Sequence, residues 1–314
     1  MNKRQSSKAD RFKGPAKYVE YLFARVLITV LQRVPIRFAC RIGRGVGWLA
    51  WNCMGRRRAT VRKNLEIINR WAAQQADGQQ SFVGLDMSID QQVKEVFQRS
   101  GANLLSGFTF ARMRPETAEK HIVFEGLELL KSSLADNKGV IILLAHMGPW
   151  EALAQLPQVA RKIDIQAPFG ALYRPLNNNY LDEWFKGVRE IQGTRLFSHR
   201  DGFHKPVDFL RSGGVLGILA DQKMRQGESV EFFGKVCKTN PLPGLFQRRS
   251  GVDVVGLSIS TIGHCKWKLK FQPVNFTAVS EERSRSSEAQ ISNHCLEQML
   301  STSPLDVFWF HKRF

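Results

Sequence analysis

Residues 139–151 constrain the fold most, because an apolar run, a histidine and a helix start follow one another there. The β-branched and aliphatic side chains of residues 140–144 predict a buried strand. His146 follows this strand, and Pro149 suits the first turn of a helix that we predict to begin there. Glu151 falls in that first turn. Open α/β sheets bind ligands outside the carboxyl ends of their strands, so both side chains lie where a functional site is expected.

Strand and helix patterns alternate along the rest of the chain. Strands are predicted over 122–125, 139–145, 165–173, 215–220, 252–261 and 266–274. Helices are predicted over 91–107, 149–161, 178–192, 204–212, 242–250 and 286–301. A surface loop is predicted over 71–90, and an exposed loop or a helix start over 281–288. This alternation predicts an α/β fold with a mixed, mostly parallel central sheet flanked by helices. The last two strands are expected to form an antiparallel pair at one edge.

Positive charge is concentrated at the N-terminus. The formal net charge of the 314 residues is +18. Residues 1–63 hold sixteen Lys or Arg and only two acids, so this segment alone carries +14. Such a basic appendage is typical of a contact with anionic membrane or nucleic acid. We therefore divide the chain into a basic, helical N-terminal segment, 1–63, and a second domain, 64–314.

Two helices are predicted in the basic segment, over 15–33 and 34–54, although three glycines make the second doubtful as a continuous helix. A row of arginines shares one helical face: Arg33, Arg37, Arg41 and Arg44. Arginines beside apolar residues and tryptophans are typical of a helix lying in a membrane interface, whereas the alternative is a domain helix with a solvated arginine face. The Arg56-Arg57-Arg58 cluster favours the membrane interpretation.

The N-terminal pattern predicts neither a signal peptide nor a good transmembrane span. The apolar run over 18–31 contains Glu20 and Arg25, and no small-residue cleavage site follows it. A span needs roughly 20 mostly apolar residues. Whether the segment spans the membrane or lies on it stays open.

The cysteines and histidines predict no metal site. The five cysteines show no paired spacing, which favours a reducing compartment over a disulfide framework. His199 and His204 are five residues apart, but a polar loop is the simpler interpretation because no third ligand is near in the sequence. We therefore expect no metal ion.

His146 and Glu151 have the spacing of a catalytic pair. The positive end of a helix dipole beside His146 would disfavour its protonated form and keep it neutral, as a general base requires. Glu151 can accept the other ring N–H, fix the tautomer and stabilise the imidazolium. No Ser or Cys lies in the motif, so direct activation of an acceptor hydroxyl is simpler than a covalent intermediate. On spacing alone, a structural histidine with a helix-capping glutamate is an equal alternative.

This motif and several others resemble the bacterial lipid A biosynthesis acyltransferases, the late lauroyl and myristoyl transferases of the lysophospholipid acyltransferase superfamily. His146 and Glu151 match the superfamily's H-x4-D/E motif. The other matching blocks, in family order over nearly the whole chain, are Gly55-Arg-Arg-Arg58, Asn64-Leu65, Tyr173-Arg-Pro-Leu176 with Asn177, Ala220-Asp-Gln222, Phe232-Phe-Gly234, Thr239 and Pro304 to Phe314.

The resemblance implies a glycerol-3-phosphate acyltransferase-like fold, with the acyltransferase domain over 64–314. It implies transfer of a fatty acyl chain from a thioester of acyl carrier protein or coenzyme A to a hydroxyl of a lipid A precursor or related glycolipid. His146 would be the general base and Glu151 would orient it, while backbone N–H groups near Gly148, or a cationic side chain, could stabilise the oxyanion. No cofactor besides the thioester co-substrate is expected.

Four further residues are assigned to substrate binding: Arg174, Asp221, Gln222 and Thr239. Arg174 suits a phosphate of the acceptor or of the carrier's arm, with a structural salt bridge as the alternative. Asp221 and Gln222 end a predicted strand on the same edge as His146 and could hold sugar hydroxyls, although such residues more often cap a strand end. Thr239 is assigned through its family block alone.

Five residues depart from the family pattern: Lys223, Arg225, Glu231, Asp306 and Val307. We expect these positions to touch the acceptor rather than the catalytic pair. The acceptor therefore stays open, and a phosphatidylinositol mannoside or an amino-acid lipid is the alternative to lipid A.

The expected location is the cytoplasmic face of a bacterial inner membrane, where anionic lipid would attract the arginines. Two other function classes remain. A lipid hydrolase is disfavoured because the chain has no G-x-S-x-G or H-E-x-x-H motif. A nucleic-acid-binding module is disfavoured because no recognisable reader follows the basic segment, so no nucleic acid is expected as a partner.

Overall fold

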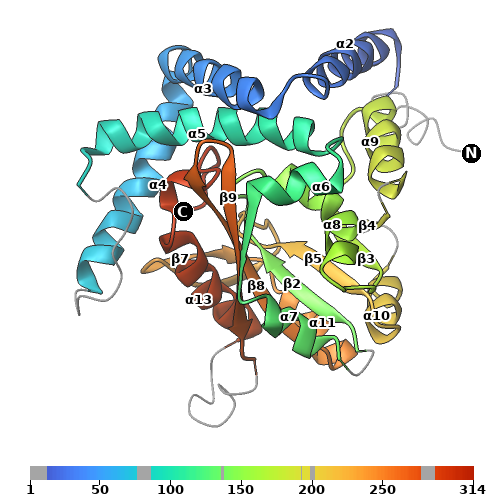
Figure 1. Cartoon of the computed structure of the whole chain (residues 1–314). Helices are drawn as coiled ribbons and strands as arrows, with labels where there is room; N and C mark the ends of the chain where they lie inside the picture. Colours follow the sequence, from blue (N-terminus) through green and yellow to red (C-terminus); the bar gives the residue numbers. More distant parts are fainter. Residues whose placement is uncertain (1–12, 76–85, 136–137, 192, 199–201, 277–286) are drawn as a thin grey trace, which may run out of the picture.

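A seven-stranded sheet forms the centre of the molecule (Figure 1). The computed structural model describes residues 13–75, 86–135, 138–191, 193–198, 202–276 and 287–314. The strands, in spatial order, are β1 (Ile122–Glu125), β9 (Lys266–Val274), β8 (Asp253–Gly263), β2 (Val140–Leu144), β5 (Val215–Leu219), β3 (Phe169–Tyr173) and β4 (Thr194–Ser198). Neighbours from β8 to β4 are parallel, while β9 runs antiparallel to β8 and parallel to β1. The predicted mixed, mostly parallel sheet is confirmed.

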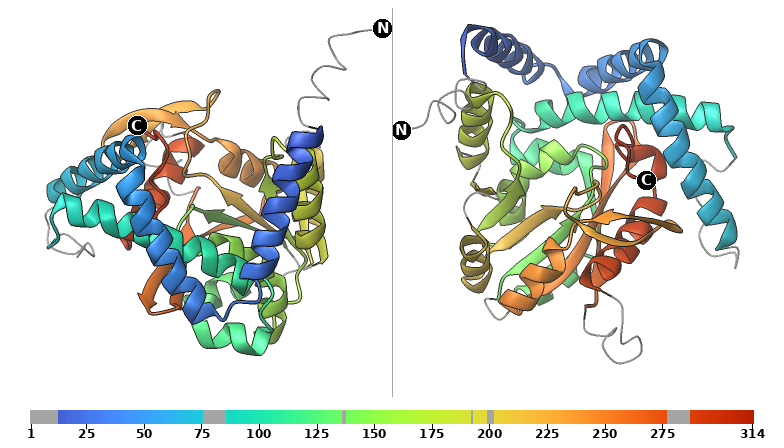
Figure 2. Two further views of the ribbon diagram at one scale, coloured as in Figure 1. Left: turned by 90° about the horizontal axis from the view of Figure 1, so that it is seen from above. Right: turned by 180° about the vertical axis from the view of Figure 1, so that it is seen from behind.

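Helices cover both faces of the sheet (Figure 2). One face carries α7 (Leu127–Ser133) and α8 (Leu156–Lys162). The other carries α10 (His204–Arg211), α11 (Leu242–Ser250) and α13 (Glu288–Ser301), while α9 (Asn179–Ile191) packs beside β4. The short helices are α6 (Pro115–Ala118), η1 (Glu119–His121), η2 (Trp150–Gln155) and η3 (Pro304–Asp306). All five residues of β2 are buried between these layers, as its unbroken apolar run predicted.

Helices from the first third of the chain form a layer across the top of the sheet (Figure 1). This layer consists of α2 (Pro15–Leu31), α3 (Ile36–Cys53) and α5 (Ile89–Phe110), while α4 (Gly55–Gln74) leads from α3 down the side of the molecule. The start of α5 is fixed by a capping box, in which the Ser88 hydroxyl accepts from Gln91 N–H and the Gln91 side chain accepts from Ser88 N–H. The division at 63/64 falls inside α4, so the change of charge along the chain does not coincide with the end of a helix.

The glycines of α3 allow a close crossing with α5. A Cβ at Gly43 would lie 2.4 Å from Gly101 O, and one at Gly47 would lie 2.2 Å from Phe97 O. Only glycine fits such an approach of two backbones. The sequence-based doubt about the helix over 34–54 was therefore wrong: α3 is continuous, because its packing against α5 compensates for the weak helix propensity of glycine.

Several elements differ from the sequence prediction. All six predicted strands are present, but β4 and the hairpin of β6 (Glu228–Phe232) and β7 (Lys235–Thr239) were missed. Phe233 and Gly234 form the hairpin turn with φ of 50° and 69°, as a two-residue type I′ turn requires. The antiparallel pair β8–β9 exists, but it is not at the edge because β1 adds outside β9. The loop predicted over 71–90 begins inside α4, and residues 76–85 and most of 281–288 lie outside the described residues.

Large apolar side chains are exposed on α2 and α3. On α2, Val19, Phe23 and Val26 are 64%, 72% and 62% exposed, and on α3 Phe38 and Leu49 are 55% and 57% exposed. The two helices lie along the top of the molecule, outside α5 (Figure 1). We call this surface the apolar face. Among the described residues, no helix is both long enough and apolar enough to cross a membrane.

Candidate active site

His146 and Asp221 meet at the carboxyl ends of two neighbouring strands. β2 and β5 are parallel and in register, with Leu144 opposite Leu219. His146 and Asp221 each follow these residues by two positions, and Ala220 N–H extends the pairing by donating to Leu144 O at 3.0 Å. Nδ1–H of His146 donates to Asp221 Oδ1 at 2.7 Å. This tautomer leaves Nε2 as the basic atom of the imidazole.

Both members of this pair are largely removed from water. The side chain of Asp221 is 2% exposed and that of His146 is 20% exposed. Burial opposes ionisation of Asp221, but the charge and hydrogen bond of His146 outweigh it and lower the pKa of the carboxyl. Burial also opposes protonation of His146, but the charge and hydrogen bond of Asp221, with the charge of Glu151, raise its pKa above the ordinary 6.5. The imidazole is thus more basic than a free histidine.

Glu151 bonds to an arginine instead of the imidazole. Arg189 of α9 donates to Glu151 Oε2 at 2.7 Å, and both side chains are about a quarter exposed. The chain after Pro149 forms the 3₁₀ helix η2, and the α-helix expected over 149–161 begins only at Leu156. A short 3₁₀ turn has poorly aligned hydrogen bonds, so the expected dipole effect on His146 is weak and the carboxylates dominate its pKa. The orienting contact predicted for Glu151 is made by Asp221.

Gly148 holds the turn between His146 and η2. Its φ is 57°, and a Cβ there would lie 2.6 Å from Ile259 Cγ2. Its N–H donates to Asp306 O at 3.0 Å. The C-terminal segment thus occupies this N–H, and the oxyanion role predicted for N–H groups near Gly148 stays a prediction. Gly148 shapes the site through backbone conformation.

We expect Gly148→Ala to lower the free energy of unfolding by about 2–5 kcal/mol. Part of the loss is the strain of an alanine in the left-handed region, and the rest is the steric clash of its Cβ with Ile259. Gly251→Ala is the matched control, because Gly251 also has a positive φ of 72° but open space around its missing Cβ. It should cost only about 1–2 kcal/mol. Denaturant unfolding of both variants measures the difference, and equal losses would contradict a steric role for Ile259.

The C-terminal segment is built into the site. Val307 bridges to Met147, and Phe308 N–H donates to His146 O at 2.8 Å. The buried carboxylate of Asp306 accepts hydrogen bonds from side chains or backbone of five donors: Arg99 Nη1, Asn103 Nδ2, Thr261 N, Thr261 Oγ1 and Ser303 Oγ. Asp306 and Val307 were expected to touch the acceptor, but both are buried and bind the segment to α5 and β8. The segment therefore fixes the backbone of His146.

The remaining predicted residues divide into exposed and buried groups. Arg174 is exposed directly after β3, and Gln222 is exposed with Nε2 at 3.4 Å from His146 Nδ1. Thr239 is 0% exposed, and its hydroxyl accepts from Arg313 and from Asn293. Neighbouring side chains therefore enclose Thr239, and its assignment to substrate binding stays a prediction.

Two arginines that bond to predicted site residues were not assigned to the site from the sequence: Arg313, which bonds to Thr239, and Arg189, which bonds to Glu151. Arg313 is 0% exposed and donates to Cys237 Sγ, Lys238 O and Thr239 Oγ1, so it joins the chain terminus to β7. Arg189 gave no local signal, because only the packing of α9 brings it to Glu151. His199 lies outside the described residues.

The site geometry can be compared with known proteins. The family model "Bacterial lipid A biosynthesis acyltransferase" matches residues 6–314. The chain belongs to this family. It is 23% identical over 286 residues to the lipid A biosynthesis palmitoleoyltransferase of Escherichia coli (strain K12), covering 90% of this chain and 86% of that protein. It is also 23% identical over 308 residues to the lauroyltransferase of the same strain, covering 96% and 92%.

Membership makes this chain an acyltransferase, as the sequence motifs predicted. A third relative, lipid A biosynthesis acyltransferase 2 of Shigella flexneri, is 25% identical over 219 residues, covering 69% of this chain and 63% of that protein. Because identity to these relatives is only 23–25%, the arrangement of the site is inferred from the structure of this chain. In that structure the His146 ring is hydrogen-bonded to the buried Asp221 carboxylate at the carboxyl ends of β2 and β5.

Proposed function

We propose that this acyltransferase moves a fatty acyl chain from a thioester to a hydroxyl of a lipid A precursor, with His146 as the general base. The observation that carries the proposal is the 2.7 Å hydrogen bond from His146 Nδ1 to the buried Asp221 carboxylate. It leaves Nε2 as a base of raised pKa on a partly exposed ring. The relatives, named for lipid A biosynthesis, support the choice of acceptor.

The reaction needs one base and no covalent enzyme intermediate. His146 Nε2 takes the proton of the acceptor hydroxyl as its oxygen bonds to the thioester carbonyl carbon. Asp221 stabilises the resulting imidazolium. When the tetrahedral intermediate collapses, the C–S bond breaks and the leaving thiolate takes the proton from the imidazolium. The products are an ester and a free thiol, and the pair returns to its starting state.

Exposed cations beside the pair favour an anionic acceptor headgroup. Lys223 and Arg225 follow Asp221 and are exposed, and Arg174 is exposed at the end of β3, two strands from β2. Arginine binds phosphate through two parallel hydrogen bonds, and lysine binds it as a point charge. We assign phosphate binding on the acceptor to Arg174 and hydroxyl binding to Gln222. The phosphate of a phosphatidylinositol mannoside would meet the same cations, so that lipid is the second candidate acceptor.

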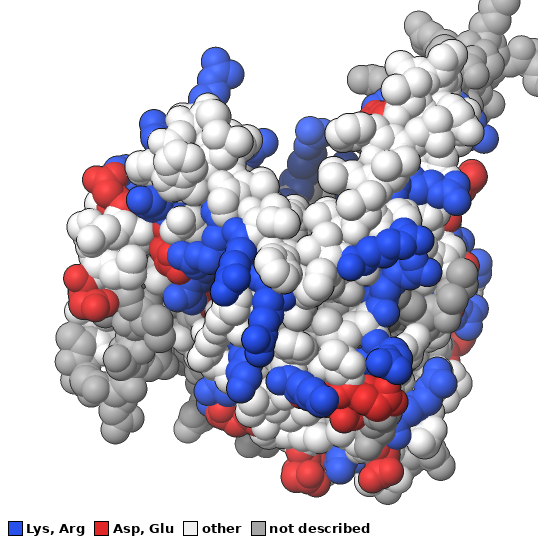
Figure 3. Space-filling model, turned by 45° about the horizontal axis from the view of Figure 1, so that its top comes forward, with Lys and Arg blue, Asp and Glu red and all other residues white. Residues whose placement is uncertain are grey.

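We assign the apolar face on α2 and α3 to the membrane surface. Lys and Arg side chains gather over the same upper side of the molecule, with few acids among them (Figure 3). An apolar ridge flanked by cations suits an interface of anionic lipid, where the apolar side chains enter the acyl region and the cations meet phosphates. A lipid acceptor would then reach the enzyme without leaving the bilayer.

We expect Phe23→Asp with Val26→Asp to lower binding to anionic vesicles about 100-fold or more, because each exposed side chain contributes roughly 1.5–3 kcal/mol when buried in lipid. Flotation with vesicles of phosphatidylglycerol and phosphatidylethanolamine measures it. Val123→Asp with Val236→Asp is the control, since these exposed apolar residues lie on strands away from α2 and α3. Equal losses in both double variants would contradict the assignment.

The function is tested with the full chain in detergent. The donors are thioesters of a labelled fatty acyl chain with acyl carrier protein or with coenzyme A. Each donor is tested with three acceptors separately: a lipid A precursor, a phosphatidylinositol mannoside and an amino-acid lipid. Mass spectrometry is expected to find an ester of the lipid A precursor. Thioester hydrolysis with no lipid ester would overturn acyl transfer, and esterification of another lipid alone would overturn the acceptor.

A further inference from the structure

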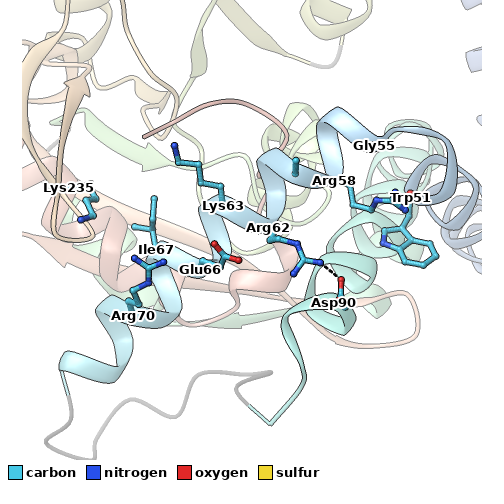
Figure 4. A pocket seen from close by; sticks show the side chains of 11 residues that line it. Trp51, Gly55, Arg58, Arg62, Lys63, Glu66, Ile67, Arg70, Asp90 and Lys235 are labelled. Atoms are coloured by element: carbon cyan, nitrogen blue, oxygen red, sulfur yellow. Dashed lines mark hydrogen bonds and ion pairs between the residues drawn. The ribbon is translucent and has the colours of Figure 1, made fainter.

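A cationic groove runs along α4 (Figure 4), and neither His146 nor Asp221 lines it. Its cavity volume is about 750 Å³, and its walls come from α4, the end of α3, the start of α5 and the β6–β7 hairpin. We call it the α4 groove. Its charged lining residues are Arg58, Arg62, Lys63, Glu66, Arg70, Asp90 and Lys235.

Three cations of the α4 groove are available to a ligand. Lys63, Arg70 and Lys235 are exposed, and they make no ion pair within the described part of the chain. Two acids line the groove: Asp90 is paired with Arg62, and Glu66 makes no ion pair among the described residues. Unpaired like charges around a concave surface raise the local positive potential. The groove therefore suits an acidic ligand.

The shape of this cationic surface suits a protein helix. Arg58, Arg62, Glu66 and Arg70 recur every four residues, so they lie along one ridge of α4. The ridge is about 18 Å long at 1.5 Å per residue. A single phosphate would engage one or two of the available cations, whereas an acidic helix laid along the groove could engage all three.

The direction of α4 separates this surface from the membrane. α4 leads down the side of the molecule from α3, away from the apolar face (Figures 1 and 2). A membrane that touches the apolar face would lie near the first turns of α4 only. Arg70 and Lys235 then face the aqueous side, which favours a soluble acidic partner over lipid.

The opposite side of α4 contacts the segment that holds His146. Asn64 Nδ2 donates to Trp309 O and to His311 O, both at 3.0 Å. Phe308 N–H donates in turn to His146 O. One stretch of chain, 308–311, thus lies between α4 and the backbone of the catalytic histidine. α4 and this segment thus connect the wall of the groove to the backbone of the catalytic histidine.

We propose that the α4 groove is the docking surface of an acidic acyl carrier protein. The proposal rests on the proposed function and adds to it the surface on which a carrier-bound acyl donor docks. Lys63, Arg70 and Lys235 hold acidic side chains of the carrier, and its thioester arm passes the C-terminal segment to reach His146 Nε2. The attraction is electrostatic, so it must weaken as salt rises.

The test reverses the three available cations together. We expect Lys63→Glu with Arg70→Glu and Lys235→Glu to raise KM for acyl carrier protein at least 10-fold at low salt, with kcat nearly unchanged. The matched control reverses three exposed cations elsewhere: Lys120, Arg195 and Arg249. KM of the control should stay within about twofold, because distant exposed charges are screened beyond the Debye length. Increasing salt should raise KM of the wild type more than that of the groove variant.

A second donor separates failure of docking from failure of the function. With a soluble pantetheine thioester, which lacks the carrier protein, the groove variant and the wild type should have equal kcat/KM. Equal carrier KM in the groove variant and the wild type overturns the docking surface while acyl transfer itself stands. Loss of vesicle binding in the groove variant, with unchanged carrier KM in detergent, assigns the α4 groove to lipid and also overturns it. No transfer by the wild type from any donor rejects the proposed function.

Discussion

Replacing His146 with glutamine is expected to lower kcat/KM for acyl transfer about 1000-fold or more, since a positioned general base contributes roughly 10²–10⁴. Glutamine keeps an N–H that can bond to Asp221, so the buried carboxylate retains a donor and the fold is expected to survive. It has no basic nitrogen to take the proton of the acceptor hydroxyl. Initial rates of lipid ester formation at pH 8 measure the loss.

The control for this variant is His204→Gln, because His204 is an exposed histidine at the start of α10. Its kcat/KM should stay within about twofold of the wild type, as surface substitutions away from a site have small effects. Circular dichroism and thermal unfolding confirm that both variants are folded. A folded His146→Gln variant that keeps more than a tenth of wild-type kcat/KM would rule out the general-base role.

The position of His146 could be predicted because its signal is local. Five consecutive apolar residues have one good solution in an α/β protein, a strand buried on both faces, and β2 has it. The residue that follows such a strand must lie at the carboxyl-end side of the sheet, where ligands bind. The same reasoning placed Asp221 on the carboxyl-end side of the sheet, since the run over 215–220 is also apolar.

The partner of His146 could not be chosen from the sequence, because spatial strand order is not chain order. From β2 the chain passes to β3 and β4 before it returns as β5 between β2 and β3. This insertion brings Asp221 to His146, although 75 residues separate them. Glu151 is close in sequence, but η2 directs it toward Arg189. His146 and Asp221 each lie two residues beyond a residue of one cross-strand pair, Leu144 and Leu219. These equal offsets predict a contact only once β2 and β5 are known to be neighbouring strands.

The burial of Asp306 was equally hidden from local patterns. A carboxylate with 0% side-chain exposure is tolerated only when charged or polar donors surround it. Its donors come from α5, β8 and the residues just before it, so no short window of sequence contains them. The same holds for Gly148, whose N–H is used by this distant segment.

The second large effect is expected from Asp221→Asn, with a fall in kcat of about 10²–10⁴. The asparagine amide can donate to Nδ1, which would hold the proton on Nε2 and remove the base. The variant also changes the pH dependence. Asp221 raises the pKa of His146 in the wild type, so the wild-type rate should fall as pH drops through a midpoint above 6.5. Without that carboxylate, burial dominates, the pKa of His146 falls, and the acid limb should move to lower pH.

The matched comparison is Glu151→Gln, which decides between the two carboxylates. Glu151 bonds to Arg189 and adds only the weaker charge effect on His146. Glu151→Gln should therefore lower kcat/KM by only about 10-fold and shift the acid limb less than Asp221→Asn does. Asp221→Glu keeps the charge and should retain the raised midpoint. Full profiles of kcat/KM from pH 5 to 9 for the wild type and the three variants measure these shifts. A larger loss and a larger shift in Glu151→Gln than in Asp221→Asn would return the orienting role to Glu151, because only the carboxylate bonded to Nδ1 controls both tautomer and basicity.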